Sequence, residues 1–153
     1  MAGELRWTCQ PFDELPARTL YALLALRTEV FVMEQNCVFQ DMDGLDLQAW
    51  HLLGWAEDGR LAACARLLPV GVKAPEVVIG RVVTAAWARG AGQGHALMRA
   101  ALAQCERLWP GEPITLHAQA RLEAFYRRHG FAPVGQEYIE DGIPHIEMNN
   151  RPH

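Results

Sequence analysis

Three glycines alternate along a short segment whose residue types can bind a phosphate or diphosphate group. The segment consists of Arg89, Gly90, Ala91, Gly92, Gln93 and Gly94. Glycine lets the backbone approach a ligand closely, and a predicted helix begins at Gln93, where unpaired N–H groups lie at the positive end of the helix dipole. Such a helix start binds anions through backbone groups alone, and the guanidinium of Arg89 adds a fork-shaped cation beside it.

Two well-known nucleotide-binding loops differ from this segment. A P-loop closes with Gly-Lys-Ser/Thr, whereas Gly94 is followed by His95 and Ala96. A dinucleotide loop spaces its glycines G-x-G-x-x-G after a first strand, whereas these glycines alternate strictly after a predicted fourth strand. A glycine-rich turn that only joins a strand to a helix is the alternative that this segment leaves open on its own.

The elements that must position this loop follow from the hydrophobic pattern. Predicted strands cover residues 5–8, 51–57, 61–68, 77–84, 114–118, 131–138 and 145–148. Predicted helices start at Pro16, with an apolar stripe that reaches Phe31, and cover residues 93–109 and 122–129. Gly80 predicts either a bulge within the fourth strand or a close approach of another backbone. Because hairpins and strand–helix–strand crossovers both occur, we expect an α/β fold with a mixed sheet.

Length and composition fit one globular domain that covers residues 1–153. The chain is 50% hydrophobic and 21% charged, which is the balance of a folded soluble protein. Its formal charge of -4 argues against a general nucleic-acid binder, because phosphate-backbone recognition depends on Lys and Arg. No apolar run approaches the roughly 20 residues of a membrane helix, and the first residues lack the pattern of a secretory signal. We therefore expect a cytoplasmic protein without nucleic-acid or membrane partners, whose four separated cysteines are reduced thiols.

A second motif lies some 30 residues after the glycine segment. Residues 125–131 read Phe-Tyr-Arg-Arg-His-Gly-Phe, and the earlier Arg89-x-x-Gly92-x-Gly94 follows a Val-Val-Thr strand. Together they resemble the two coenzyme A signatures of the GNAT N-acetyltransferase superfamily, in the same order and in the same elements. The predicted order of strands and helices also matches the GNAT fold across nearly the whole chain.

Further segments resemble one subfamily. Residues 26–35 resemble the first-helix motif L-R-x-x-V-F-V-x-E-Q, and with residues 40–44, 51–55 and 141–145 they resemble the ElaA-like bacterial GNATs from end to end. The resemblance implies the GNAT (acyl-CoA N-acyltransferase) fold, a mixed and mostly antiparallel sheet flanked by helices.

The resemblance also implies acetyl-CoA as the acetyl donor, with no metal. The diphosphate would bind the backbone of residues 89–94. The other implied coenzyme contacts are the main-chain groups of Val82, Val83 and Thr84, which would pair with the pantetheine arm, and the side-chain amide of Gln119, which stands where the family often has an asparagine. An amide near Val83 would polarise the thioester oxygen. No His/Cys cluster has the spacing of a structural zinc site.

The resemblance assigns a general acid more readily than a general base. Tyr126 matches the family tyrosine that protonates the departing thiolate, and a phenol of pKa about 10 suits a thiol of about 8.5. Many GNATs carry a basic glutamate on the fourth strand, where this chain has Val78; Glu76, two residues earlier and on the same face of a regular strand, is therefore the predicted base. The alternatives are solvent and four other side chains, Glu34, His51, His117 and His145.

We expect an N-acetyltransferase in which a primary amine of a small molecule or peptide attacks acetyl-CoA directly in a ternary complex. Asp41, Asp43 and Asp46 either line an entrance for such a cationic amine or, as we expect, cap turns and face water. A homodimer would be consistent with the family. The alternatives are a catalytically weak coenzyme A-binding sensor or interaction module, and acyl transfer from another thioester, because the first-helix motif also resembles acyl-homoserine-lactone synthases.

Overall fold

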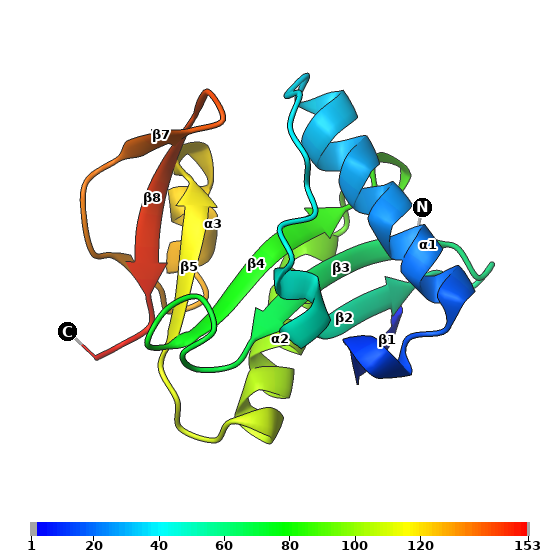
Figure 1. Cartoon of the computed structure of the whole chain (residues 1–153), viewed down its shortest axis with the longest axis horizontal. Coiled ribbons are helices and arrows are strands. Elements are labelled where there is room, and N and C mark those ends of the chain that lie inside the picture. The colour runs from blue at the N-terminus through cyan, green and yellow to red at the C-terminus, as the bar shows by residue number, and fades with distance from the viewer. Residues whose placement is uncertain (1–2, 153) are drawn as a thin grey trace.

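The computed structural model describes residues 3–152 and shows one mixed sheet with helices on both faces (Figure 1). The strands are β1 (Arg6–Pro11), β2 (Trp50–Trp55), β3 (Leu61–Leu68), β4 (Val77–Thr84), β5 (Ile114–Gln119), β6 (Ala132–Pro133), β7 (Tyr138–Glu140) and β8 (Ile143–Asn149). The α-helices are α1 (Ala17–Arg27), α2 (Gln93–Leu108) and α3 (Glu123–Arg127). After α1 the chain continues as a π-helix over Thr28–Glu34.

The strands form the order β1-β2-β3-β4-β5-β8-β6, with β7 also paired to β8. All neighbours are antiparallel except β4 and β5, which are parallel because α2 crosses over between them. The predicted α/β fold with a mixed, mostly antiparallel sheet is confirmed. In Figure 1, α1 lies in front of the sheet, whereas α2 and α3 lie behind it.

The parallel pair opens into two arms. β4 and β5 are in register only at Val77↔Ile114 and Val78↔Thr115, and beyond these pairs the two strands diverge (Figure 1). The predicted bulge at Gly80 is present, because the β3–β4 register shifts between Cys64 and Arg66 and Arg81 takes a positive φ of 50°. The second half of β4 therefore keeps an edge that β5 does not cover.

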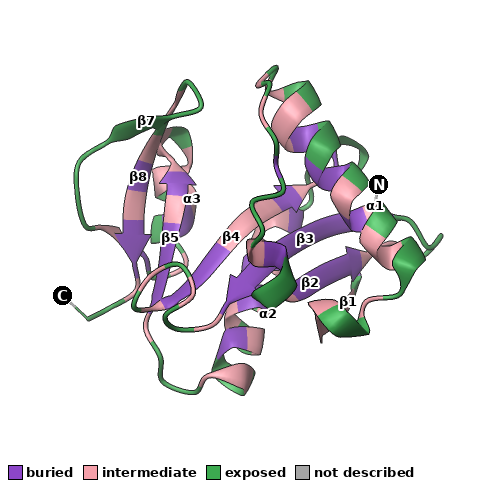
Figure 2. Ribbon diagram, in the orientation of Figure 1, coloured by how far each residue is buried: buried purple, intermediate pink, exposed green. Residues whose placement is uncertain are grey.

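The core lies on both sides of β2, β3 and β4, which are the most buried strands in Figure 2. All eight residues of β3 are buried, as expected for a central strand. The buried face of α2 presents Leu97, Met98, Ala101 and Cys105 at helical spacing. This packing holds the N-terminal end of α2 at the open end of β4, where the glycine loop precedes it.

Two predicted elements differ in extent. The strand predicted over residues 131–138 is divided into β6 and β7, because Pro133 lacks an N–H donor and Gly135 adds no side chain that packs. The helix predicted over residues 122–129 is shorter, since a 3-10 turn at Ala120–Leu122 precedes α3. Cys9, Cys37, Cys64 and Cys105 are free thiols, as predicted. No helix within the described residues is long and apolar enough to span a membrane.

The three aspartates that were predicted to cap turns and face water form a network with three arginines, in which all members except Asp43 and Arg81 are buried. This aspartate–arginine network consists of Arg27, Arg66, Arg81, Asp41, Asp43 and Asp46. Arg27 is 1% exposed; it donates from Nε to Asp41 at 2.7 Å and from Nη1 to Asp46 at 2.8 Å. Arg66 donates to both oxygens of Asp43, at 2.8 and 3.0 Å.

The prediction is wrong for Asp41 and Asp46, which are 5% and 7% exposed. Asp43 is exposed and accepts a hydrogen bond from the Leu45 amide at 3.0 Å, as a residue that caps a turn does. All three aspartates are short anions matched to arginines of α1, β3 and β4, which sequence spacing alone does not bring together. Because three cations meet three anions, the network is neutral as a unit, as burial of charge requires. It ties the loop before β2 to the bulge of β4.

Acid should destabilise the fold through this network. Burial opposes ionisation of Asp43, but hydrogen bonds from Arg66 and the Leu45 amide outweigh it and lower its pKa to about 2; the pKa of Asp46 is also lowered, by Arg27 against burial. Since both native pKa values lie below those of the unfolded chain, the stability they contribute is present above about pH 4 and is lost as the pH falls toward 2.

Urea unfolding at a series of pH values between about 6 and 3 measures this loss. Asp43→Asn cannot ionise, so its free energy of unfolding should fall less steeply over this range than that of the wild type. An equal slope in both proteins would contradict the assignment of Asp43 as an ionised partner of Arg66.

Candidate active site

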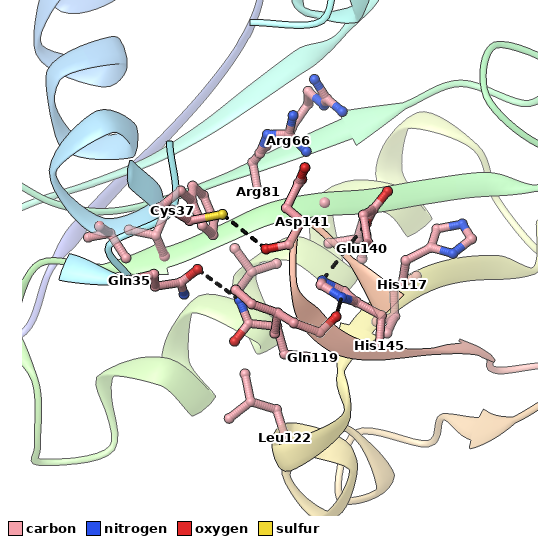
Figure 3. Close-up of a pocket in the computed structure, with 18 of the residues that line it drawn as sticks. Gln35, Cys37, Arg66, Arg81, His117, Gln119, Leu122, Glu140, Asp141 and His145 are labelled. Atoms are coloured by element: carbon pink, nitrogen blue, oxygen red, sulfur yellow. Dashed lines mark hydrogen bonds and ion pairs between the residues drawn. The ribbon is translucent and has the colours of Figure 1, made fainter. Parts of the chain in front are cut away.

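A cavity of about 790 Å³ occupies the space between the diverging arms of β4 and β5. Its walls come from the π-helix and the loop after it, the whole of β4 from Val78 to Thr84, the second half of β5, and the β7–β8 hairpin. Figure 3 shows side chains from these segments pointing toward one another around the cavity. The parallel register at the base of the arms and the bulge in β4 together account for this opening.

The glycine loop lies where β4 ends and α2 begins. Gly90, Ala91 and Gly92 have consecutive positive φ values of 97°, 52° and 77°, a conformation that favours glycine. Within residues 3–152, the N–H groups of Ala91, Gly92 and Gly94 donate to no acceptor. These groups at the start of a helix of 16 residues form an anion site of the kind that a diphosphate fits.

Arg89 closes one side of this loop. Its Nε donates to the carbonyl of Thr84 at 3.1 Å, and its Nη1 pairs with Glu34 of the π-helix at 2.7 Å. A Cβ on Gly94 would lie 3.4 Å from Cε1 of Phe125, at the limit of ordinary contact. The absent side chain therefore lets the first turn of α2 pack against α3.

The structure brings most of the predicted coenzyme residues to the cavity. Those that line it are Val82, Val83, Thr84, Arg89, Gly90, Gly94 and Gln119. Gln119 donates from Nε2 to Oε1 of Gln35 at 3.3 Å, across the cavity from the π-helix (Figure 3).

Gln93 was predicted to contact the coenzyme, but it does not line the cavity. Its amide N–H donates to the Gly90 carbonyl at 3.2 Å, and its side chain, 7% exposed, donates to the Gly3 carbonyl at 3.0 Å. Gln93 thus anchors the chain before β1 to the start of α2 instead of facing the cavity. Ala91 and Gly92 are also absent from the cavity wall, and both are exposed.

A methyl group at Gly92 should weaken binding of acetyl-CoA. Alanine keeps the N–H group but disfavours the φ of 77° at Gly92, so the amide should no longer be aimed at the diphosphate. Loss of one hydrogen bond to a charged group costs about 1.5–3 kcal/mol, so Gly92→Ala is expected to raise the Kd for acetyl-CoA about tenfold or more. Isothermal titration calorimetry measures this change.

Gly111 provides a matched control at the other end of α2. Its φ of 76° equals that of Gly92 within a degree, and neither residue has an atom within 4 Å of an added Cβ. Both alanine variants should lose similar stability, about 1–2 kcal/mol for a left-handed residue, but Gly111→Ala should keep the wild-type Kd. Equal affinities in the two variants would remove the loop from the coenzyme site.

Tyr126 of α3 lines the cavity with its ring 6% exposed. The ring packs edge-on against Phe125 and Phe131, with centroids 5.0 and 6.4 Å away. Burial raises the pKa of its phenol to about 12, slightly offset by Arg121. Its hydroxyl has no hydrogen-bond partner within the described residues. A buried phenol that stays protonated and belongs to the wall of a cavity is suited to proton donation.

Glu76 is not supported as the base. It is absent from the cavity wall, because it precedes β4 at the closed end of the arms. Its two oxygens accept from Thr115 Oγ1 at 2.8 Å and pair with Arg151 at 2.6 Å, and the hydrogen bonds from Arg151 and Thr115 lower its pKa. Glu76 does share a face with Val78, as predicted, but it lies at the wrong end of that face.

Of the four alternative bases, His51 also lies elsewhere. It is 1% exposed and bonds through Nε2 to the Asp46 carbonyl at 3.0 Å. Glu34 lines the cavity but pairs with Arg89. His117 and His145 both line the cavity, from β5 and β8.

The side of the cavity away from the glycine loop is polar. Gln35, Cys37, Lys73 and Glu140 line it, and sequence reasoning did not assign them a role. Cys37 Sγ lies 3.2 Å from the Asp141 carbonyl, so the loop after the π-helix touches the tip of the β7–β8 hairpin (Figure 3). The one signal that pointed here was the segment of residues 141–145, which resembles the ElaA-like group.

Residues 25–151 match the acetyltransferase (GNAT) domain family. The chain belongs to this family, and its fold is the GNAT acyl-CoA N-acyltransferase fold.

Among individual proteins, the chain is 47% identical over 146 residues to Protein ElaA of Escherichia coli (strain K12), across 94% of this chain and 95% of ElaA. The crystal structure of Escherichia coli ElaA matches with a TM-score of 0.89 and 46% identity over 96% of this chain and 99% of ElaA. That of an acyl-CoA N-acyltransferase from Pseudomonas aeruginosa matches with a TM-score of 0.92 and 52% identity over 96% of this chain and 99% of the other. The predicted ElaA-like resemblance is confirmed.

Proposed function

We propose that this protein transfers the acetyl group of acetyl-CoA to a primary amine of a small molecule or peptide. The observation that supports the proposal is one cavity between the arms of β4 and β5 whose wall includes Gly90 and Gly94 of the glycine loop and Tyr126 of α3. Membership of the GNAT acetyltransferase family supports acetyl-CoA as the donor.

The donor would occupy the β4 side of the cavity. The unpaired amides of Ala91, Gly92 and Gly94 would hold its diphosphate. Val82, Val83 and Thr84 line the cavity on the edge of β4 that β5 leaves uncovered, so their main-chain groups would pair with the pantetheine arm as an added strand does. The acetyl-CoA thioester supplies the activated acyl group.

Two groups of the chain would assist the transfer. A main-chain amide near Val83 would donate to the thioester oxygen as negative charge develops there. Tyr126 would give its proton to the departing sulfur, which it can do at neutral pH because its phenol is protonated. The amine attacks in the same complex, so no covalent intermediate on the protein is needed.

Coenzyme binding without catalysis is the second candidate function, favoured by the absence of a carboxylate at Val78 on β4. Calorimetry with acetyl-CoA, followed by a thiol-release assay over polyamines, amino acids, aminoglycosides and peptides, separates the two. The enzyme predicts that at least one amine accelerates thiol release above the rate without acceptor. Tight binding of acetyl-CoA with no acceleration by any amine would favour the sensor.

A further inference from the structure

We propose that Nε2 of His145 accepts the proton that the acceptor amine loses. This inference rests on the proposed acetyl transfer and names the base that it lacks. His145 lines the cavity with a side chain that is 13% exposed, and it lies opposite Gln119 in the β5–β8 register. Paired residues of antiparallel strands share a face, so His145 projects to the same side as Gln119, which also lines the cavity.

The backbone sets the tautomer of the His145 ring. Its Nδ1 lies 2.8 Å from the carbonyl oxygen of Ile143. Because a carbonyl oxygen only accepts, Nδ1 must carry the proton, and Nε2 of the neutral ring keeps its lone pair. The described residues supply no hydrogen bond to Nε2 that would occupy this lone pair.

The carboxylate of Glu140 lies close enough to the His145 ring to stabilise its protonated form. Glu140 Oε2 lies 3.8 Å from Nε2, a distance that forms an ion pair once the ring is charged (Figure 3). Tyr138 stacks on the ring with centroids 5.9 Å apart. Tyr138 and Glu140 belong to β7, whose pairing with β8 places Tyr138 opposite His145. The hairpin thus packs on one side of the His145 ring, and the residue lines the cavity.

The other ionisable groups of the cavity wall are less suited to this role. Glu34 is paired with Arg89, and Asp43 has a pKa of about 2 within the aspartate–arginine network. His117 donates or accepts through Nδ1 at 3.0 Å from the Tyr138 hydroxyl. Burial lowers the pKa of His117, as does the positive charge of Lys73.

The bonds and protons of the proposed transfer balance with Tyr126 and His145 alone. The amine nitrogen bonds to the acetyl carbon as the carbon–sulfur bond breaks. The nitrogen gives its proton to Nε2 of His145, and the sulfur takes the proton of the Tyr126 hydroxyl. The imidazolium and the phenolate then return to their neutral forms by exchanging one proton through solvent, so no further reactant is required.

His145→Gln tests the inference, with the panel amine that gives the fastest thiol release as acceptor. A general base contributes about 100-fold or more, so kcat should fall about 100-fold while the Kd for acetyl-CoA in calorimetry stays within about twofold. The wild-type kcat should rise with pH, because a general base acts in its unprotonated form, and this rise should disappear in the variant. Added imidazole should restore part of the rate of His145→Ala.

His117→Gln is the matched control, because His117 lies on the same face and lines the same cavity. The kcat of this control variant should still rise with pH, whereas that of His145→Gln should not. Tyr138 and Glu140 contact the His145 ring, and His117, which also lies near Lys73 and Glu147, interacts with it through charge. Glu140→Gln should therefore move the midpoint of the pH profile, whereas a change confined to structure would leave it in place.

Two outcomes would overturn the inference, and they differ from failure of the proposed function. An unchanged kcat and pH profile in His145→Gln would leave solvent as the base while the enzyme stands. Nitrogen NMR that finds the His145 proton on Nε2 would exclude the base without any acceptor assay. If no amine accelerates thiol release by the wild type, the proposed function itself fails.

Discussion

Replacing Tyr126 with phenylalanine is expected to lower kcat about 100-fold with little change in the Kd for acetyl-CoA or in stability. General acid catalysis contributes at least about this factor. The phenylalanine ring keeps the contacts with Phe125 and Phe131. Because the hydroxyl has no partner within the described residues, its removal breaks no hydrogen bond that supports the fold.

This variant separates the two interpretations of Tyr126 because a packing residue would tolerate the change. Thiol release by Tyr126→Phe and by the wild type, at saturating acetyl-CoA, gives the comparison. Tyr21→Phe on α1 is the control, since Tyr21 is 79% exposed; it should keep the wild-type kcat. Full turnover in Tyr126→Phe would show that the ring only packs.

Replacing Arg27 with methionine is expected to cost about 3–5 kcal/mol of folding free energy, the range for breaking a buried ion pair from one side. Arg27 is 1% exposed, and its removal leaves Asp41 and Asp46 with one cation fewer. The methionine restores most of the volume, so the loss comes from uncompensated charge more than from a cavity. Urea unfolding near pH 7 measures the change.

An exposed arginine provides the matched control. Arg127 pairs with Glu123 one turn away on α3, with side chains 54% and 35% exposed, and such helix-surface pairs are worth about 0.3–0.5 kcal/mol. Arg127→Met should thus lie within about 1 kcal/mol of the wild type. Asp46→Asn, which keeps the shape of the side chain, should be destabilised like Arg27→Met. A cost below about 1 kcal/mol for both network variants would contradict a structural role for the network.

The part of the cavity formed by β4, the glycine loop and the start of α2 was predictable, because the sequence patterns that indicate these elements are local. The predicted strand over residues 77–84 and the predicted helix start at Gln93 coincide with β4 and α2. The alternating glycines between them indicate a backbone conformation that other residues rarely adopt. The bulge at Gly80 was predictable for the same reason. Tyr126 reached the cavity because its motif fixes the start of α3 relative to that loop.

The opposite part of the cavity, near the aspartate–arginine network and the β7–β8 hairpin, was not predictable, because it depends on contacts between residues far apart in the sequence. Arg27 reads as part of an amphipathic stripe, and only the tertiary fold brings it to Asp41 and Asp46. Glu76 satisfied the alternation rule, yet the rule does not say which end of a strand opens into a cavity. His145 stood among several candidates until the β7–β8 register placed it beside Glu140.

Transfer of a labelled acetyl group tests the central claim most directly. Acetyl-CoA labelled with carbon-13 in the acetyl group is incubated with the protein and the amine panel, and mass spectrometry follows the amines while a thiol reagent follows free coenzyme A. The account predicts one labelled N-acetyl amine for each thiol released, at a rate that Tyr126→Phe lowers about 100-fold. Bound acetyl-CoA with no labelled amine, or thiol release without N-acetylation, would contradict it.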